Sequence, residues 1–167
     1  MIEAFAAAIL LGGINTIADV VSTELKVGSS PVYILARVLI ICYCVGGIVG
    51  ARGRQMLMGS VGGVMIGAVV SATYYLLAPS LGWWAVAPAW SIFWLAFSLL
   101  DALVHGGTIA GAVIQALAAI LLSAGFYFGI TNLWPPERGS DPSIWRALAS
   151  WSFTFLPGFI VLFWRKL

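Results

Sequence analysis

Apolar blocks of about twenty residues alternate with short polar breaks along the chain, and this spacing constrains the fold more than any other feature. Of the 167 residues, 62% are hydrophobic and 8% are charged, and the mean hydropathy is +1.04. A soluble domain carries about 25% charged residues, because water must solvate its surface. The surface of this chain must instead contact lipid, so we expect an all-α, polytopic integral membrane protein.

The blocks predict about six membrane-crossing helices, because a helix needs about 20 apolar residues to span a hydrocarbon core of about 30 Å. The breaks are too short for an extramembrane domain, so we expect a single compact bundle over residues 1–167 whose neighbouring helices run antiparallel. The predicted spans cover residues 4–23, 31–50, 56–78, 83–104, 107–130 and 143–164.

The orientation in the membrane is predicted from the basic residues in the breaks. An even number of spans places both termini on one side, and loops on the cytoplasmic side are enriched in Lys and Arg. Both termini are therefore expected to be cytoplasmic. The basic residues of that side are Arg52, Arg54, Arg165 and Lys166, against Lys26, Arg138 and Arg146 on the other.

Small residues recur at every fourth position in two of the predicted spans. Such a row lets two helix backbones approach closely and gain dispersion contacts. We favour packing within the chain over the alternative, an interface between subunits of a homo-oligomer. The glycines of these rows are Gly59, Gly63 and Gly67 in the third span, and Gly107 and Gly111 in the fifth.

Ionisable residues inside the predicted spans are functional candidates, because a charge in hydrocarbon is costly unless it is paired. Asp19 and Arg37 fall at similar depth in antiparallel neighbours, which predicts a structural ion pair. Asp101 and His105 lie one helical turn apart at the end of the fourth span, and this pair is either solvated or docks a partner. Gln115, in the middle of the fifth span, is expected to form an interhelical hydrogen bond.

The sequence offers little support for catalysis. It contains one histidine, and it lacks the Gly-x-Ser-x-Gly, Ser-x-x-Lys and His-Glu-x-x-His motifs. Cys42 and Cys44 fall on different faces of one span and are expected to be small apolar side chains rather than ligands. We therefore expect a protein that is not an enzyme, with no cofactor, no metal and no nucleic-acid partner.

Several short stretches resemble the Insig family of six-span membrane proteins. The first runs from Phe97-Ser98-Leu99-Leu100-Asp101 into Gly106-Gly107-Thr108-Ile109-Ala110-Gly111, and resembles the family's aromatic-rich fourth helix and its entry to span five. The second runs from Ser150-Trp151 through Leu156-Pro157-Gly158 to Arg165-Lys166-Leu167, like the family's last span and basic end. Tyr127-Phe128-Gly129 also fits, and the compact length is similar to that of a bacterial relative.

The resemblance implies a non-enzymatic protein whose helices enclose a cavity for a diacyl lipid or sterol-like ligand. It also implies that Asp101 matches the family's partner-related acid, and a bacterial relative would lie in the inner (plasma) membrane. Trp90, Trp94 and Phe97 share one face of the predicted fourth span and are the expected wall of the cavity, together with Gln115. Plain packing explains the same spacing of these rings.

A second function is also compatible with the sequence, namely the substrate-binding membrane subunit of a vitamin-type transporter. Such a subunit would use a small-residue face, such as Gly59, Gly63 and Gly67, to dock on a scaffold protein. It would also need long outer loops to bury a water-soluble vitamin, and only residues 132–142 qualify. We therefore favour the lipid binder, and a small enzyme of lipid metabolism is disfavoured by the missing catalytic residues.

Overall fold

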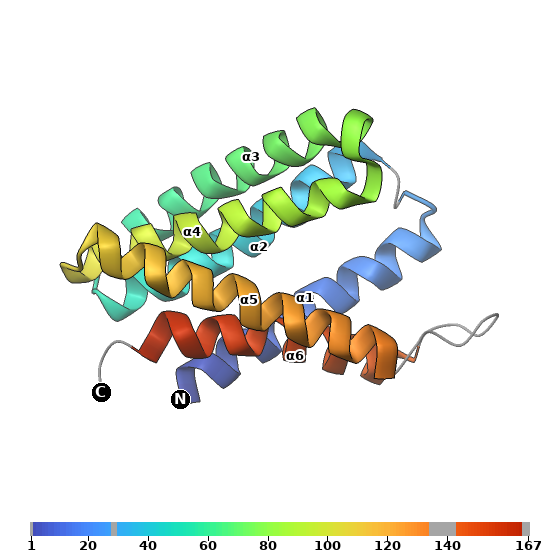
Figure 1. The fold of residues 1–167 in the computed structure, drawn as a ribbon. Helices are drawn as coiled ribbons and strands as arrows, with labels where there is room; N and C mark the ends of the chain where they lie inside the picture. The colour runs from blue at the N-terminus through green and yellow to red at the C-terminus, as the bar shows by residue number, and fades with distance from the viewer. Residues whose placement is uncertain (1, 28–29, 134–142, 165–167) are drawn as a thin grey trace. The chain divides into compact units, whose positions relative to one another are not determined.

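The computed structural model describes residues 2–27, 30–133 and 143–164, and every regular element among them is helical (Figure 1). This confirms the all-α fold. The elements are the helices α1 (Ile2–Glu24), α2 (Pro31–Arg52), α3 (Met56–Leu81), α4 (Val86–His105), α5 (Ile109–Leu133) and α6 (Ile144–Phe163), with a single 3₁₀ turn, η1 (Gly82–Ala85), between α3 and α4.

Five helical segments of the described chain are long and apolar enough to cross a membrane, and they indicate an integral membrane protein. The count differs from the predicted six because α3, η1 and α4 form one helical run, Met56–His105, of 50 residues. The third predicted span ends at residue 78, but α3 continues to Leu81 with Pro79 inside it. Proline inside a helix lacks the backbone N–H donor, and its ring crowds the carbonyl four residues earlier.

The chain divides into two units that are described separately. One unit consists of Ser29–Leu117 and contains α2, α3, η1, α4 and the first part of α5. The other consists of Met1–Gly28 with Ala118–Leu167, and contains α1, α6 and the remainder of α5.

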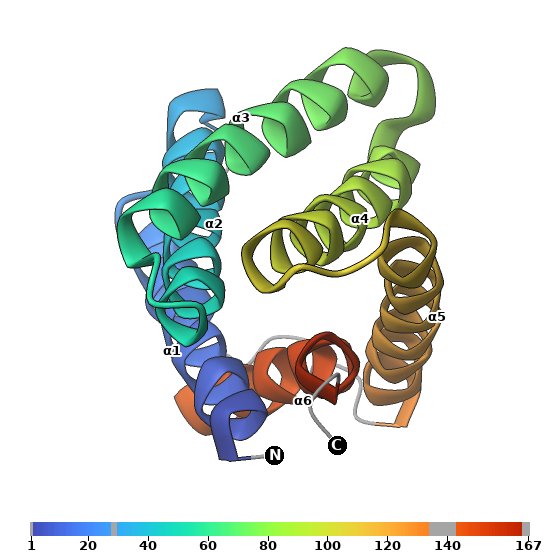
Figure 2. The same ribbon diagram turned by 90° about the vertical axis from the view of Figure 1, so that its left-hand side faces the viewer.

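Two glycines end helices in backbone conformations that other residues rarely adopt. Gly82, after α3, has a φ of 55°, and Gly106, after α4, has a φ of 71°. A glycine enters this region without the steric penalty of a Cβ atom. The chain reverses direction at Gly82, and α3 and α4 pack against each other (Figure 2).

Within the first of these units, α2 and α3 pack with their backbones in close contact through glycine. A Cβ atom built on Gly63 would overlap the carbonyl oxygen of Cys42, and one built on Gly59 would overlap that of Gly46. A Cβ on Gly67 would lie 3.0 Å from the Cβ of Cys42. The row Gly59, Gly63 and Gly67 therefore contacts a helix of the same chain.

In the other unit, α1 and α6 pack as antiparallel neighbours, with the start of α1 beside the end of α6 (Figures 1 and 2). Gly12 of α1 lies against the backbone of Ser152, whose nitrogen would be 3.0 Å from a Cβ at that position. The buried face of α1 is mostly small: Ala4, Ala7, Ala8, Leu11, Gly12, Asn15 and Thr16. The rings of α6 form a row at every fourth position, and the last three are buried: Trp151, Phe155, Phe159 and Phe163.

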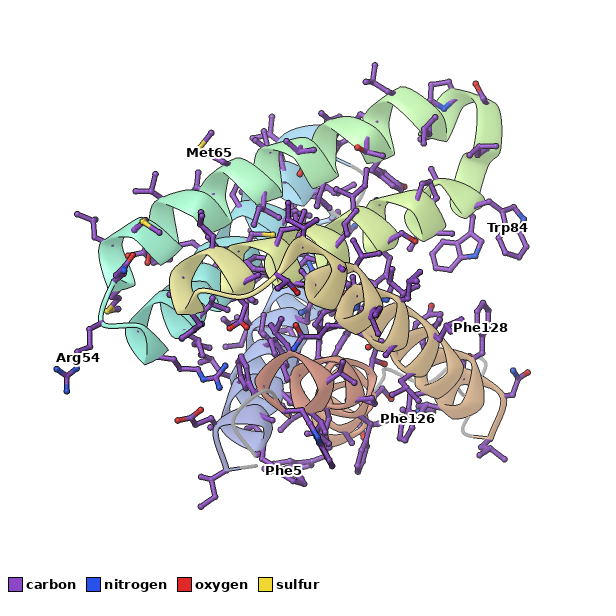
Figure 3. The ribbon with its side chains drawn as sticks, turned by 60° about the vertical axis from the view of Figure 1, so that its left-hand side comes forward. Phe5, Arg54, Met65, Trp84, Phe126 and Phe128 are labelled. Carbon is purple, nitrogen blue, oxygen red and sulfur yellow. The ribbon has the colours of Figure 1, made fainter. Side chains whose placement is uncertain are left out.

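Large apolar side chains cover the outside of both units, as expected for surfaces in lipid. Met65 is 66% exposed and Trp84 is 65% exposed, and both extend outward from their helices (Figure 3). Phe5, Phe126 and Phe128 also lie on the outside. Water would not solvate such a surface, which is consistent with a membrane-embedded chain.

Candidate functional site

The most distinctive internal feature of the unit Ser29–Leu117 is a row of aromatic rings along α4. Trp90 stacks on Phe93 at 5.7 Å between ring centroids, and Phe93 meets Trp94 edge to face at 5.1 Å. Phe93 also meets Phe97 at 4.8 Å. Trp94 and Phe97 are 0% exposed, whereas Trp90 is half-buried and forms the accessible end of the row.

The same face of α4 becomes polar two turns further along. Residues 94, 97, 101 and 105 fall on one side of the helix, so the aromatic row leads to Asp101 and His105. Asp101 is 2% exposed, and its Oδ1 atom lies 3.6 Å from Nη1 of Arg52, the last residue of α2. An apolar wall therefore ends at an ionic cluster that joins two helices.

His105 has a defined hydrogen-bonding state in this cluster. Its Nδ1 lies 3.0 Å from Oδ1 of Asp101 and 3.0 Å from the backbone oxygen of the same residue. The backbone oxygen is an acceptor, so Nδ1 carries a hydrogen and donates it to that atom, while its approach to Oδ1 lies within the distance of a salt bridge. The other ring nitrogen, Nε2, is buried and has no hydrogen-bond partner among the described residues.

These contacts bear on one of the two interpretations of Asp101 and His105, and partner docking stays a prediction. The interpretation of a solvated pair is wrong, because the carboxylate is buried and His105 is only 12% exposed. Arg52 was used in the sequence analysis only to predict orientation. Its pairing with Asp101 joins residues 49 positions apart in the sequence, and no local pattern signals such a pair.

Asp19 has a partner that the sequence analysis did not identify. The indole nitrogen of Trp151 on α6 donates a hydrogen bond of 2.7 Å to Oδ2 of Asp19 on α1. No local pattern in the sequence pairs Trp151 with α1. The predicted ion pair between Asp19 and Arg37 joins the two separately described units and stays a prediction.

The remaining predicted site residues, which lie in or next to α5, do not form a cluster of their own. Gln115 is partly buried in α5. Gly111 lies in the first turn of α5, where its backbone N–H donates to Oγ1 of Thr108 at 3.1 Å. Gly107 was predicted to begin the fifth span, but it precedes α5 and its N–H donates to the carbonyl of Ala102 at 2.6 Å. The fifth span starts later because Thr108 acts as the helix cap.

The described residues contain no group of three or more His, Cys, Asp or Glu side chains that could hold a metal ion. The arrangement on α4 instead combines a ring surface for apolar groups with a buried acid, a histidine and an arginine. Comparison with models of protein families, with curated proteins and with solved structures gives no match for this chain.

Proposed function

We propose that this chain is a non-enzymatic, Insig-like membrane protein that binds an apolar lipid or sterol-like ligand along α4. One observation carries the proposal, namely the row Trp90, Phe93, Trp94 and Phe97, in which the ring of Phe93 contacts each of the other three. Fused and single rings form a rigid apolar wall, which can select a ligand by shape.

The polar residues at one end of this aromatic wall support an amphipathic ligand, with an apolar tail and a polar headgroup. A lipid tail gains little from leaving the bilayer, because its surroundings are already apolar. Selectivity must therefore come from shape and from a few polar groups. Arg52, Asp101 and His105 follow the aromatic row on the same side of α4, where a headgroup would lie.

Because the aromatic row of α4 is largely buried, a ligand can reach it only after a change in helix packing. Since Trp94 and Phe97 are fully buried, a ligand that contacts both rings must part α4 from the residues that cover it. A partner protein that docks on Asp101 must likewise separate it from Arg52. We therefore expect ligand or partner binding to be coupled to movement of α4.

The transporter alternative loses the observation that favoured it. It required the row Gly59, Gly63 and Gly67 to be available for a scaffold protein. Each of these glycines lies against α2 of the same chain; Gly59 and Gly63 leave no room for a methyl group, and at Gly67 a methyl group would make a tight contact. The same packing removes this row from any interface of a homo-oligomer.

We further propose that the chain crosses the membrane about six times, with both termini in the cytoplasm of a bacterial cell. A straight helix over Met56–His105 would be about 75 Å long, more than twice the hydrocarbon thickness. The reversal at Gly82 and the contact of α3 with α4 support two crossings instead. The tie between Arg52 and Asp101 also fits, since it places the ends of α2 and α4 together.

Mass spectrometry of lipids that co-purify in mild detergent tests the binding proposal. The parent protein should retain a defined lipid above its proportion in the membrane, and Trp94→Ala should change which lipid is retained. Leu121→Ala is the matched control, because Leu121 is 72% exposed on α5, and it should leave the profile unchanged. If the parent retains only bulk lipids, or if both variants match the parent, the proposal fails.

Loss of folding would give the same result as loss of binding, so a milder variant is needed. Trp90→Leu changes the accessible ring of the row and leaves the buried rings in place. It should alter lipid selection while the protein remains monodisperse.

A further inference from the structure

We propose that the exposed indoles of Trp83 and Trp84 anchor the turn between α3 and α4 in the headgroup zone of the membrane. Their ring N–H groups donate to ester or phosphate oxygens of phospholipids, while the ring faces lie against the upper part of the acyl chains. The inference rests on the proposed double crossing of Met56–His105, and it adds the lipid surface that fixes the depth of the reversal.

The two rings are neighbours on the outer side of the turn. Trp83 is 61% exposed and Trp84 is 65% exposed, whereas Ala85, the next residue of η1, is 0% exposed. Trp84 extends away from the helices (Figure 3). The inner side of the turn is therefore packed against the protein, and its outer side presents two indoles to the surroundings.

The turn has no charged side chain that could hold it at the membrane surface. From Gln55 to Leu100 the sequence contains no Asp, Glu, Lys, Arg or His. The turn nevertheless cannot lie in hydrocarbon facing lipid, because backbone groups outside a regular helix need hydrogen-bond partners. An indole is a large apolar ring with one N–H donor, so it favours the headgroup zone over both hydrocarbon and water. Two adjacent indoles therefore hold the turn where charged residues would otherwise do so.

The opposite end of the same unit carries charge, and it lies about one membrane thickness away. The helix α4 has 20 residues and is therefore about 30 Å long, which matches the thickness of the hydrocarbon core. Arg54 precedes α3 and Trp84 follows it, and the two side chains extend outward at opposite ends of the unit (Figure 3). Indoles at one end and an arginine at the other thus fit the two headgroup zones of one bilayer.

Tyrosines near the end of α3 connect this aromatic end to the start of α2. The rings of Tyr74 and Tyr75 meet edge to face at 5.5 Å between centroids. The hydroxyl of Tyr75 donates a hydrogen bond of 2.8 Å to the carbonyl oxygen of Pro31, the first residue of α2. An anchor on the turn therefore sets the depth of α2 as well as that of α3 and α4.

The depth of the two rings can be measured in the full chain reconstituted into phosphatidylcholine vesicles. Bromine placed on the lipid near the ester group, or near the end of the acyl chain, quenches indole fluorescence at a known depth. The signal lost on changing Trp83→Phe and Trp84→Phe together separates these rings from the rest of the eight tryptophans, and phenylalanine keeps a ring at each position. We expect this signal to be quenched more by the shallow bromine than by the deep one. Stronger quenching by the deep bromine would overturn the proposal, and so would no quenching by either, which would show that protein or water covers the rings.

The substitution Ser80→Cys reports what the rings do for the turn, because Ser80 is exposed beside it. In a chain with Cys42→Ala and Cys44→Ala, changing both indoles to leucine keeps an apolar surface but removes both N–H donors. The turn should then sink, and reaction of the thiol with a water-soluble maleimide should slow about threefold or more, because a shift of a few ångström carries it into hydrocarbon.

Trp145→Leu is the matched control, because Trp145 is 79% exposed on α6, and it should leave the rate unchanged. Equal rates with and without the two indoles would overturn the anchor. The side from which Ser80→Cys reacts is a separate result. Reaction from the side of residue 54 would contradict the double crossing, whereas the quenching depth tests the anchor alone.

Discussion

Asp101 is the residue whose environment is hardest to explain by packing alone. A carboxylate near the C-terminal end of a helix opposes the helix dipole, and burial adds a desolvation cost. Arg52 and His105 offset both costs, because each places a basic group beside the same oxygen atom. A single residue thus joins the ends of α2 and α4 and lies where the aromatic row of α4 ends.

Removing one member of this cluster should be more harmful than removing both charged partners. Asp101→Asn removes the carboxylate that Arg52 contacts, and Arg52→Gln removes the guanidinium that Asp101 contacts. Unfolding in SDS-containing mixed micelles should give a coupling of about 0.5–3 kcal/mol in the double-mutant cycle. Strict additivity of the two single changes would show that the contact has no energetic role.

Trp151 provides a second residue-level prediction. Trp151→Phe keeps the ring but removes the hydrogen bond to Asp19, and this should cost about 1–3 kcal/mol of unfolding free energy. Trp145→Phe is the control, since Trp145 is 79% exposed on the same helix and should change stability little. Equal effects of the two substitutions would contradict the role given to the hydrogen bond.

At the scale of the elements, each unit contains a pair of closely packed helices, and the two pairs are held by different kinds of contact. In α2 and α3, glycine faces glycine and the backbones nearly touch. In α1 and α6, Gly12 lies against the backbone of Ser152, and Trp151 donates a hydrogen bond to Asp19. Since lipid is as apolar as the side chains, close packing rather than exclusion of water must hold these pairs together.

Adding one methyl group to the α2–α3 contact tests this account. Gly63→Ala places a Cβ atom on the carbonyl of Cys42, so the helices must separate, at a cost of about 1–3 kcal/mol. Gly125→Ala is the matched control, because nothing lies within 4 Å of the added atom. That variant should be neutral, or more stable by up to about 1 kcal/mol through helix propensity. A Gly63→Ala protein as stable as the parent would contradict the contact.

Much of each helix could be predicted from hydropathy, whereas the pairing of helices could not. The predicted spans begin and end within a few residues of the observed helices, because helix length is set by membrane thickness. The α6 row at positions 151, 155, 159 and 163 was visible in the sequence and was missed. The contacts of Arg52 with Asp101 and of Asp19 with Trp151 join distant positions, so they depend on the tertiary fold rather than on any local pattern.

At the scale of the whole molecule, the central claim is that Met56–His105 crosses the membrane twice. The helical run has 50 residues, but Gly82 reverses the chain within it. Under the proposed topology, two crossings would give the chain an even total and would place both termini on one side. They also place Arg54 and the turn after α4 on one side, as the tie between Arg52 and Asp101 requires.

Single-cysteine labelling with a membrane-impermeant maleimide tests this claim most directly. Cysteines would replace Arg54, Trp84 and Thr108 one at a time, in a chain with Cys42→Ala and Cys44→Ala; all three positions are exposed and precede or follow long helices. We predict that the cysteines at 54 and 108 react from the same side of the membrane and the cysteine at 84 from the opposite side. Reaction of 54 and 108 from opposite sides would show a single crossing and contradict the account.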